Sequence, residues 1–320
     1  MTDGDSISGT ELDRRLIVIG GKGGVGRTTV AAALALILAR RGRRVLLAHV
    51  RTRQRVDRLL GCKRIDHKIR RVEPNLWAVN MNPRAALKER GLMVLRFQVI
   101  YKAVMENRLV KHFLRAIPSL DEYSMLGKAW FHTTEEIHEG EPRFHTVIFD
   151  GPATGHLLTM LRIPQVILDT VPDGPLTADA RTIRDLLVDP QRTGLWIVTL
   201  AEEIPVTEAE DLLQEAQEKL KILPQRLVVN ALYPKDLVQD PEISKGLDLL
   251  LRGAGDPALS PLVSSALTLR SRREINETYL KRLARNVPLP TTRLPYLFDP
   301  ELDRAALEKL AEVLEESLDL

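Results

Sequence analysis

Short runs of apolar residues alternate with longer stretches of helical periodicity along the chain. The short runs predict strands, and the amphipathic or Ala/Leu-rich stretches predict helices, of which the first is stopped by Gly42. This alternation predicts an α/β fold: a doubly wound, mostly parallel sheet of seven or eight strands with helices on both faces. The predicted strands are Leu16–Gly20, Val45–Val50, Leu76–Met81, His145–Asp150, Leu195–Leu200 and Arg226–Ala231, and the predicted helices are Thr28–Arg41, Glu208–Leu220 and Asp303–Leu318.

Residues 83–118 do not fit a minimal sheet of this kind. Their apolar positions recur partly at helical spacing, but residues 92–95 are apolar on every side. Two interpretations stay open: helices buried against the sheet, or an exposed apolar groove for a protein client. We expect one domain over 1–320, with a helical insertion at 83–140. Residues 240–286 also read as helices, interrupted at 253–261, but their role does not follow from the sequence.

Composition excludes several classes of protein. Apolar residues make up 44% and charged residues 28% of the 320 residues, which is typical of a globular chain. The longest apolar run, Val30 to Ala39, is about half the length that a membrane span needs, and the first fifteen residues show no secretory signal. The single cysteine, Cys62, excludes an intrachain disulfide framework, and no HxxxH spacing favours a zinc hydrolase. We expect a cytoplasmic protein without a transmembrane segment.

The net charge of +3 is unevenly distributed. Between Arg40 and Arg71 there are thirteen Lys or Arg residues against Asp57 and Asp66. The segment is either a solvated basic face or a surface for an acidic partner, a nucleotide or nucleic acid. It holds no aromatic residue, so stacking on single-stranded bases is disfavoured.

The strongest chemical signal is a phosphate-binding loop. Residues 21–28 follow a predicted strand and open a predicted helix, which is the context that a P-loop requires. Glycines let main-chain amides approach an anion, and the helix N-terminus adds partial positive charge. Thr28 is placed to ligate Mg²⁺, and Thr29 to reach the α-phosphate. The loop consists of Gly21, Lys22, Gly23, Gly24, Val25, Gly26, Arg27 and Thr28.

Arg27 stands where a P-loop usually has lysine. A planar guanidinium donates from a fork, whereas an ammonium is a compact point charge, so the replacement changes the geometry. Anion binding can survive this change, but alignment of the transition state is sensitive to displacements of about 1 Å.

Several motifs together resemble one family of ATPases. The loop sequence KGGVG is similar to the deviant Walker A motif of MinD/ParA and arsenical-pump ATPases. The segment 150–156, DGPATGH, resembles the DTAPTGH switch of arsenical-pump (ArsA-type) and tail-anchored-protein targeting ATPases, and the likeness continues through 157–164, 118–126 and 200–210. It covers residues from about 15 to 315. The chain resembles a degenerate member of this family.

The resemblance implies roles for individual residues. Lys22 would reach across a dimer to the partner's phosphates, and Asn230 would read adenine. Asp150, after a strand beside the loop, is expected to hold Mg²⁺ through water. Residues 288–296 are expected to complete either the sheet or the adenine pocket. The implied cofactors are ATP or ADP with Mg²⁺.

One departure from the family concerns catalysis. Aligned without gaps, Arg51 stands where the STDPAHS segment of the family carries the aspartate that orients the attacking water. Arginine accepts no proton, so we expect nucleotide binding with weak or lost hydrolysis, in a homodimer or in a heterodimer with an intact ArsA-like paralogue. The alternative is a ParA/MinD-like positioning ATPase that binds nucleic acid through residues 40–71.

Overall fold

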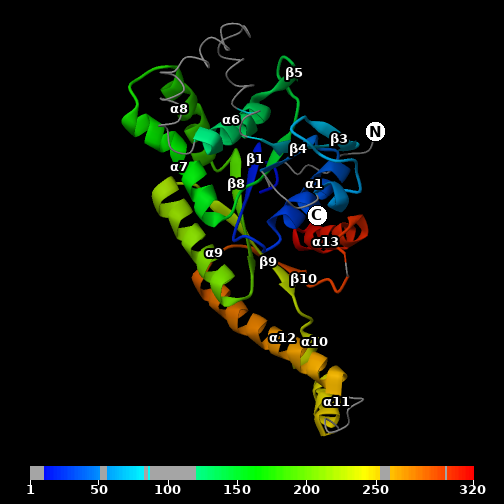
Figure 1. Cartoon of the computed structure of the whole chain (residues 1–320). Coiled ribbons are helices and arrows are strands. Elements are labelled where there is room, and N and C mark those ends of the chain that lie inside the picture. Colours follow the sequence, from blue (N-terminus) through cyan, green and yellow to red (C-terminus); the bar gives the residue numbers. More distant parts are fainter. Residues whose placement is uncertain (1–10, 51–55, 83–85, 87–119, 253–259, 300) are drawn as a thin grey trace.

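The structure is a computed structural model, and it describes residues 11–50, 56–82, 86, 120–252, 260–299 and 301–320. A sheet of eight strands, in the order β10-β9-β8-β1-β7-β2-β4-β3, forms its centre (Figure 1). All neighbouring strands are parallel except β3, which runs antiparallel to β4. The strands are β1 (Leu16–Gly20), β2 (Val45–Val50), β3 (Arg70–Glu73), β4 (Leu76–Met81), β7 (Thr146–Asp150), β8 (Thr193–Leu200), β9 (Pro224–Leu232) and β10 (Thr291–Pro295).

Helices cover both faces of this sheet, as the sequence predicts (Figure 1). One apolar core joins a face of the sheet to α6 (Leu120–Thr134), α7 (Thr154–Thr170), α8 (Pro175–Val188) and α9 (Glu203–Glu215). A second core joins the other face to α1 (Arg27–Arg40), α2 (Val56–Leu59) and α13 (Arg304–Ser317). The apolar run Val30–Ala39 is therefore the buried helix α1, whose residues 28–39 are all buried. No helix in the described ranges combines the length and apolarity that crossing a bilayer demands.

The segment between β9 and β10 forms a helical arm. It contains α10 (Asp236–Gln239), α11 (Pro241–Arg252) and the long helix α12 (Ser260–Asn286). Figure 1 shows α12 running away from the sheet, with α11 near its distant end. The prediction of helices over 240–286 is confirmed for these ranges, whereas residues 253–259 of the predicted break lie outside the described residues.

Several boundaries differ from the prediction. Helix α9 begins at Glu203 rather than 208, and the chain continues as a π-helix, η1 (Ala216–Leu220). Strand β3 and the hairpin of β5 (Glu136–His138) and β6 (Glu141–Pro142) were not predicted, because they are short and mostly polar. The last residues of the predicted helical insertion 83–140 are therefore strand and turn rather than helix. Helix α6 is the part of the insertion that the structure describes as helical, and residues 83–118 lie outside the described residues apart from Ala86.

Strand β10 pairs with β9, so residues 288–296 complete the sheet. The central strands β1, β7 and β2 end together at one edge, with Ile19 opposite Asp150 and Asp150 opposite His49. In a parallel sheet this carboxyl edge is where ligands bind, and the loop 21–28 lies here.

Candidate functional site

The loop 21–28 leaves β1 and enters α1 with its glycines in conformations that side chains oppose. Gly21 has φ +144° and Gly26 has φ +91°, values that favour glycine. A Cβ on Gly21 would overlap the carbonyl oxygen of Val198, and one on Gly26 would overlap the amide nitrogen of Asn230. At Gly23, by contrast, no atom of the described residues lies within 4 Å of the Cβ position. The loop is therefore held tightly at both ends and open at its crest.

Thr28 and Asp150 form a buried pair below this loop. The Thr28 hydroxyl donates to Oδ2 of Asp150 at 2.6 Å, and the aspartate is only 3% exposed. Oδ1 of Asp150 is buried and accepts no hydrogen bond from the described residues. Burial raises the pKa of Asp150 to about 6, although the Thr28 hydrogen bond and the charge of Arg27 both lower it.

This pair fits a Mg²⁺ site of the kind that P-loop proteins use. A hydroxyl and a carboxylate are ligands that the ion prefers, and a carboxylate oxygen without a donor can accept from a metal-bound water. Within the described ranges no group of three or more His, Cys, Asp or Glu could hold a metal ion. A Mg²⁺ ion held by Thr28 and Asp150 would take its remaining ligands from phosphates and water.

Arg27 does not extend into solvent. Its guanidinium donates to the carbonyl oxygen of Gly151 at 2.6 Å and to that of Pro152. Burial lowers the pKa of Arg27, and the charge of Asp150 opposes this shift. The side chain thus ties the start of α1 to the segment that follows β7, where the resemblance implies a switch.

Lys22 is bound within its own chain. Its ammonium lies 2.5 Å from Oε1 of Glu208 on α9, and both side chains are about one third exposed. An ion pair as exposed as this one stabilises a fold little, and it can exchange partners readily. The cross-dimer contact implied by the resemblance therefore requires Lys22 to leave Glu208.

Asn230 contacts the loop itself. Its amide donates to the carbonyl oxygen of Val25 at 2.9 Å, so one of its donors stabilises the loop. Thr29, expected to reach an α-phosphate, is buried in the first turn of α1.

Beyond the ends of β9 and β10, Tyr233 stacks on Tyr296 at 4.8 Å between ring centroids. This aromatic pair was not predicted, although the YP that follows β9 and the PY at the end of β10 mark its position.

His49, which lies opposite Asp150 in the sheet, is a further buried polar residue of this edge that was not predicted. It is 2% exposed, and neither ring nitrogen has a hydrogen-bond partner among the described residues. Burial lowers the pKa of His49 to about 4, partly opposed by Asp57, so the ring is neutral at neutral pH. The signal in the sequence that could have identified His49 is a polar residue near the end of the apolar run VLLAHV.

Arg51, which carries the expectation of impaired water activation, lies outside the described residues, as does the apolar client segment 83–118 apart from Ala86. Of the two residues that depart from the family's catalytic pattern, Arg27 and Arg51, the structure describes only Arg27.

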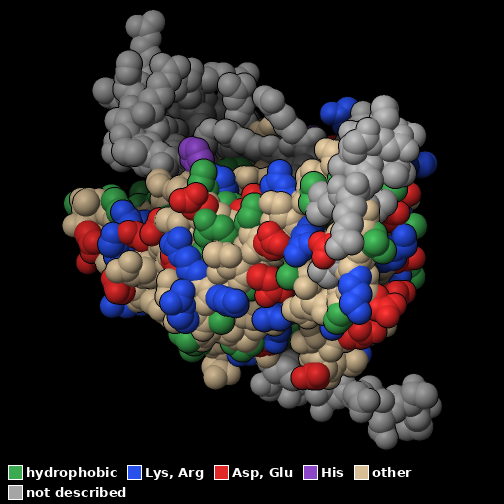
Figure 2. Space-filling view, turned by 90° about the horizontal axis from the view of Figure 1, so that it is seen from below, with side chains coloured by type: hydrophobic (Ala, Val, Ile, Leu, Met, Phe, Trp, Pro, Cys, Tyr) green, Lys and Arg blue, Asp and Glu red, His purple; other side chains and the backbone are tan. Residues whose placement is uncertain are grey.

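Within the described residues, five of the thirteen Lys and Arg side chains of the basic segment 40–71 pair with acids outside the segment. Figure 2 shows that, on one face of the molecule, Lys and Arg side chains are interspersed with Asp and Glu. Such pairing reduces the excess charge that the segment offers to a polyanion. The ion pairs are Arg40–Glu308, Arg41–Glu315, Arg43–Asp13, Arg44–Glu141 and Arg58–Glu301.

Comparison with known proteins agrees with this geometry. A family model described as anion-transporting ATPase (ArsA-type) matches residues 14–172. The chain is 28% identical to ATPase BagA of Mycobacterium tuberculosis, over 94% of this chain and 92% of that protein. It is 26% identical to ATPase GET3 of Candida glabrata, over 64% and 69% of the two chains. It is 27% identical to the arsenical pump-driving ATPase of Acidiphilium multivorum, over 88% of this chain and 51% of that protein. With the strand–loop–helix at 16–40 and the eight-stranded sheet, these matches mean that the chain belongs to the ArsA-type family of anion-transporting ATPases.

Proposed function

We propose that this chain binds ATP or ADP with Mg²⁺ on the loop 21–28 and acts as a nucleotide-dependent dimeric switch with weak or lost hydrolysis. The observation that carries the proposal is the buried Thr28–Asp150 pair beneath the glycine loop. Main-chain amides of the loop and the N-terminus of α1 would hold the phosphates, and the pair would hold the metal ion. Bound Mg²⁺ would neutralise phosphate charge, which is its role in this class of site.

The weakness of hydrolysis follows from Arg27. The position usually supplies a lysine that reaches the terminal phosphates, but here the guanidinium donates to two carbonyl groups after β7. Reaching a phosphate would cost both hydrogen bonds. Arg51 adds a second departure in sequence, outside the described residues.

The dimeric part of the proposal concerns Lys22. In a dimer, its ammonium would exchange Glu208 for the phosphates of the partner site. Self-association of the purified chain with MgATP would indicate a homodimer, and association only with a paralogue that keeps the usual lysine and aspartate would indicate a heterodimer. The nucleic-acid alternative is less well supported, because five arginines of the segment 40–71 pair with acids of the same chain.

Gly23→Asp is expected to weaken MgADP binding by about tenfold or more, because it places a carboxylate at an anion-binding loop. The fold should not change, since no described atom lies near the new Cβ. The measurement is the rise in melting temperature with MgADP concentration. Gly246→Asp makes the same chemical change on α11, far from the loop (Figure 1), and should leave the rise intact. An unaltered MgADP response in Gly23→Asp would contradict binding on this loop.

Arg27→Lys is expected to raise steady-state phosphate release from saturating MgATP by about tenfold, because it restores a point charge able to reach the terminal phosphate. Arg27→Gln, which also breaks the hydrogen bonds to Gly151 and Pro152 but supplies no charge, is the matched control and should not gain activity. A wild-type turnover on the order of 1 s⁻¹ or faster would contradict impaired hydrolysis.

A further inference from the structure

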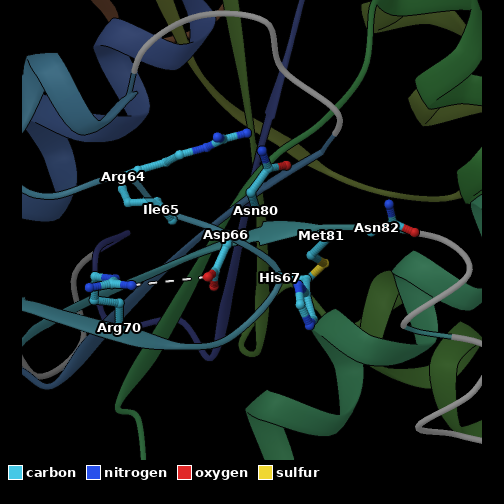
Figure 3. A pocket seen from close by; sticks show the side chains of 8 residues that line it. All are labelled: Arg64, Ile65, Asp66, His67, Arg70, Asn80, Met81 and Asn82. Atoms are coloured by element: carbon cyan, nitrogen blue, oxygen red, sulfur yellow. Dashed lines mark ion pairs between the residues drawn. The ribbon is translucent and has the colours of Figure 1, made fainter.

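A cavity opens at the carboxyl end of β4. It lies between the residues that link α2 to β3 and the residues that end β4, and its volume is about 500 Å³. Figure 3 shows Arg64, His67 and Arg70 arranged around it, with Asn80 at the end of the strand. A volume of this size is typical of small-molecule sites. Most of its lining residues belong to the basic segment 40–71, which has no role in the proposed nucleotide site.

Arg64 is available to a ligand. Its side chain extends across the cavity toward Asn80 (Figure 3), and it forms no ion pair within the described part of the chain. In this it differs from the arginines at 40, 41, 43, 44 and 58, which all pair with acids. A guanidinium and a carboxamide that face one another offer several N–H donors to one oxyanion.

Arg70 adds a second cationic group. Its Nε is buried and has no hydrogen-bond partner in the described residues, so this donor is unsatisfied. The single acid of the lining, Asp66, is already engaged: it accepts from the N–H of Lys68 at 2.9 Å and lies 4.0 Å from Arg70. The lining therefore carries two arginines against one aspartate and is positive overall.

Asn80 is fixed in place by the sheet. Its N–H donates to the carbonyl oxygen of Asp66 at 2.8 Å, and in the sheet it lies opposite His49, whose neighbour on the other side is Asp150. The cavity is thus on the same sheet edge as the phosphate loop but separated from it by strands β7 and β2. This is the edge at which parallel sheets bind ligands.

We propose that this cavity is a second anion site, which binds a small oxyanion of at least two negative charges, such as a phosphate group, between Arg64, Arg70 and Asn80. A concave lining without Phe, Tyr or Trp side chains fits a small anion better than a nucleic-acid strand. The inference does not depend on nucleotide binding at residues 21–28.

The test is a calorimetric titration of inorganic phosphate into the full-length chain at constant ionic strength. The Gly23→Asp background is used, so that phosphate binding at the loop 21–28 is weakened. The expected result is saturable binding at one site. Arg64→Gln should weaken it by about tenfold, because it removes a charge-assisted pair of hydrogen bonds. Asn80→Asp, which is nearly isosteric and adds a negative charge, should weaken it at least as much.

The matched control is Lys63→Gln, which removes the same charge one residue away on an exposed side chain outside the lining. It should change phosphate affinity by less than about twofold, because an exposed charge is screened by salt. Equal weakening by Lys63→Gln and Arg64→Gln would overturn the proposal, as would the absence of saturable phosphate binding. Binding of duplex DNA without binding of phosphate would also overturn it. Because Arg64 is exposed, its variant decides the matter even if Asn80→Asp is poorly folded.

Discussion

Asp150→Asn should stabilise the nucleotide-free protein at neutral pH by roughly 2–3 kcal/mol, although it removes a residue proposed to hold Mg²⁺. The carboxylate is buried, and burial raises its pKa from 3.8 to about 6, which means that the fold prefers the neutral form. Each pKa unit corresponds to about 1.4 kcal/mol. Asparagine is neutral, has nearly the same shape, and can still accept the hydrogen bond of Thr28.

The difference between the two proteins should depend on pH in a defined window. The stabilising effect of protonating Asp150 is fully present below pH 3.8 and is lost as the pH rises through about 6. The advantage of the asparagine variant therefore grows over this range and is nearly absent at its acid end. His49 acts in the opposite direction, because its pKa is lowered to about 4 and its contribution is lost as the pH falls below 6.5. Both proteins carry His49, so the comparison cancels its effect.

Urea unfolding of wild type and Asp150→Asn at several pH values gives this difference directly. Asp173→Asn is the control, since that side chain is 94% exposed and the change should stay within about 0.5 kcal/mol. Addition of MgADP should reverse the order of stability, because only the wild type keeps the carboxylate for the ion. If Asp150→Asn is less stable than wild type at neutral pH without ligand, the raised pKa of Asp150 is contradicted.

The sheet was predictable because its central strands are buried on both faces. A mostly apolar run such as VIFD or LWIVTL is stable only where helices cover both faces of the sheet. These runs predicted the bounds of the six central strands to within about two residues. The antiparallel edge strand β3 was not predictable in this way. Its sequence RRVE is polar, and it is held by pairing with β4 rather than by burial.

The phosphate loop was predictable because its chemistry is local in sequence. Glycine spacing, the preceding strand and the following helix determine the geometry of residues 21–28. Thr28 and Asp150, both expected at a Mg²⁺ site, are hydrogen-bonded to one another in the structure, and their binding of the ion stays a prediction. The partners of the charged residues were not predictable. Lys22 binds Glu208, and Arg27 binds the carbonyl groups of residues 151 and 152, contacts that join positions more than a hundred residues apart. The excess of arginine in 40–71 was likewise a poor guide to function, because five of these arginines pair with acids that lie far away in the sequence or outside the segment.

Gly21→Ala is expected to destabilise the protein by about 3–5 kcal/mol. The residue has φ +144°, which an L side chain rarely adopts, and its Cβ would overlap the carbonyl oxygen of Val198. That oxygen belongs to β8, which pairs with β1 in the middle of the sheet, so neither strand can move aside cheaply. The loop must therefore shift, and MgADP binding should weaken together with stability.

Gly23→Ala is the matched control for this effect. It adds the same methyl group two residues along the same loop, but no described atom lies within 4 Å of it and its φ is not in the left-handed region. Its free energy of unfolding should lie within about 0.5 kcal/mol of wild type. Equal losses in the two variants would mean that the loop tolerates no side chain anywhere. Equal stability of all three proteins would mean that Gly21 does not cross Val198 as closely as the structure shows, and the rigid placement of the phosphate loop over β8 would have to be abandoned.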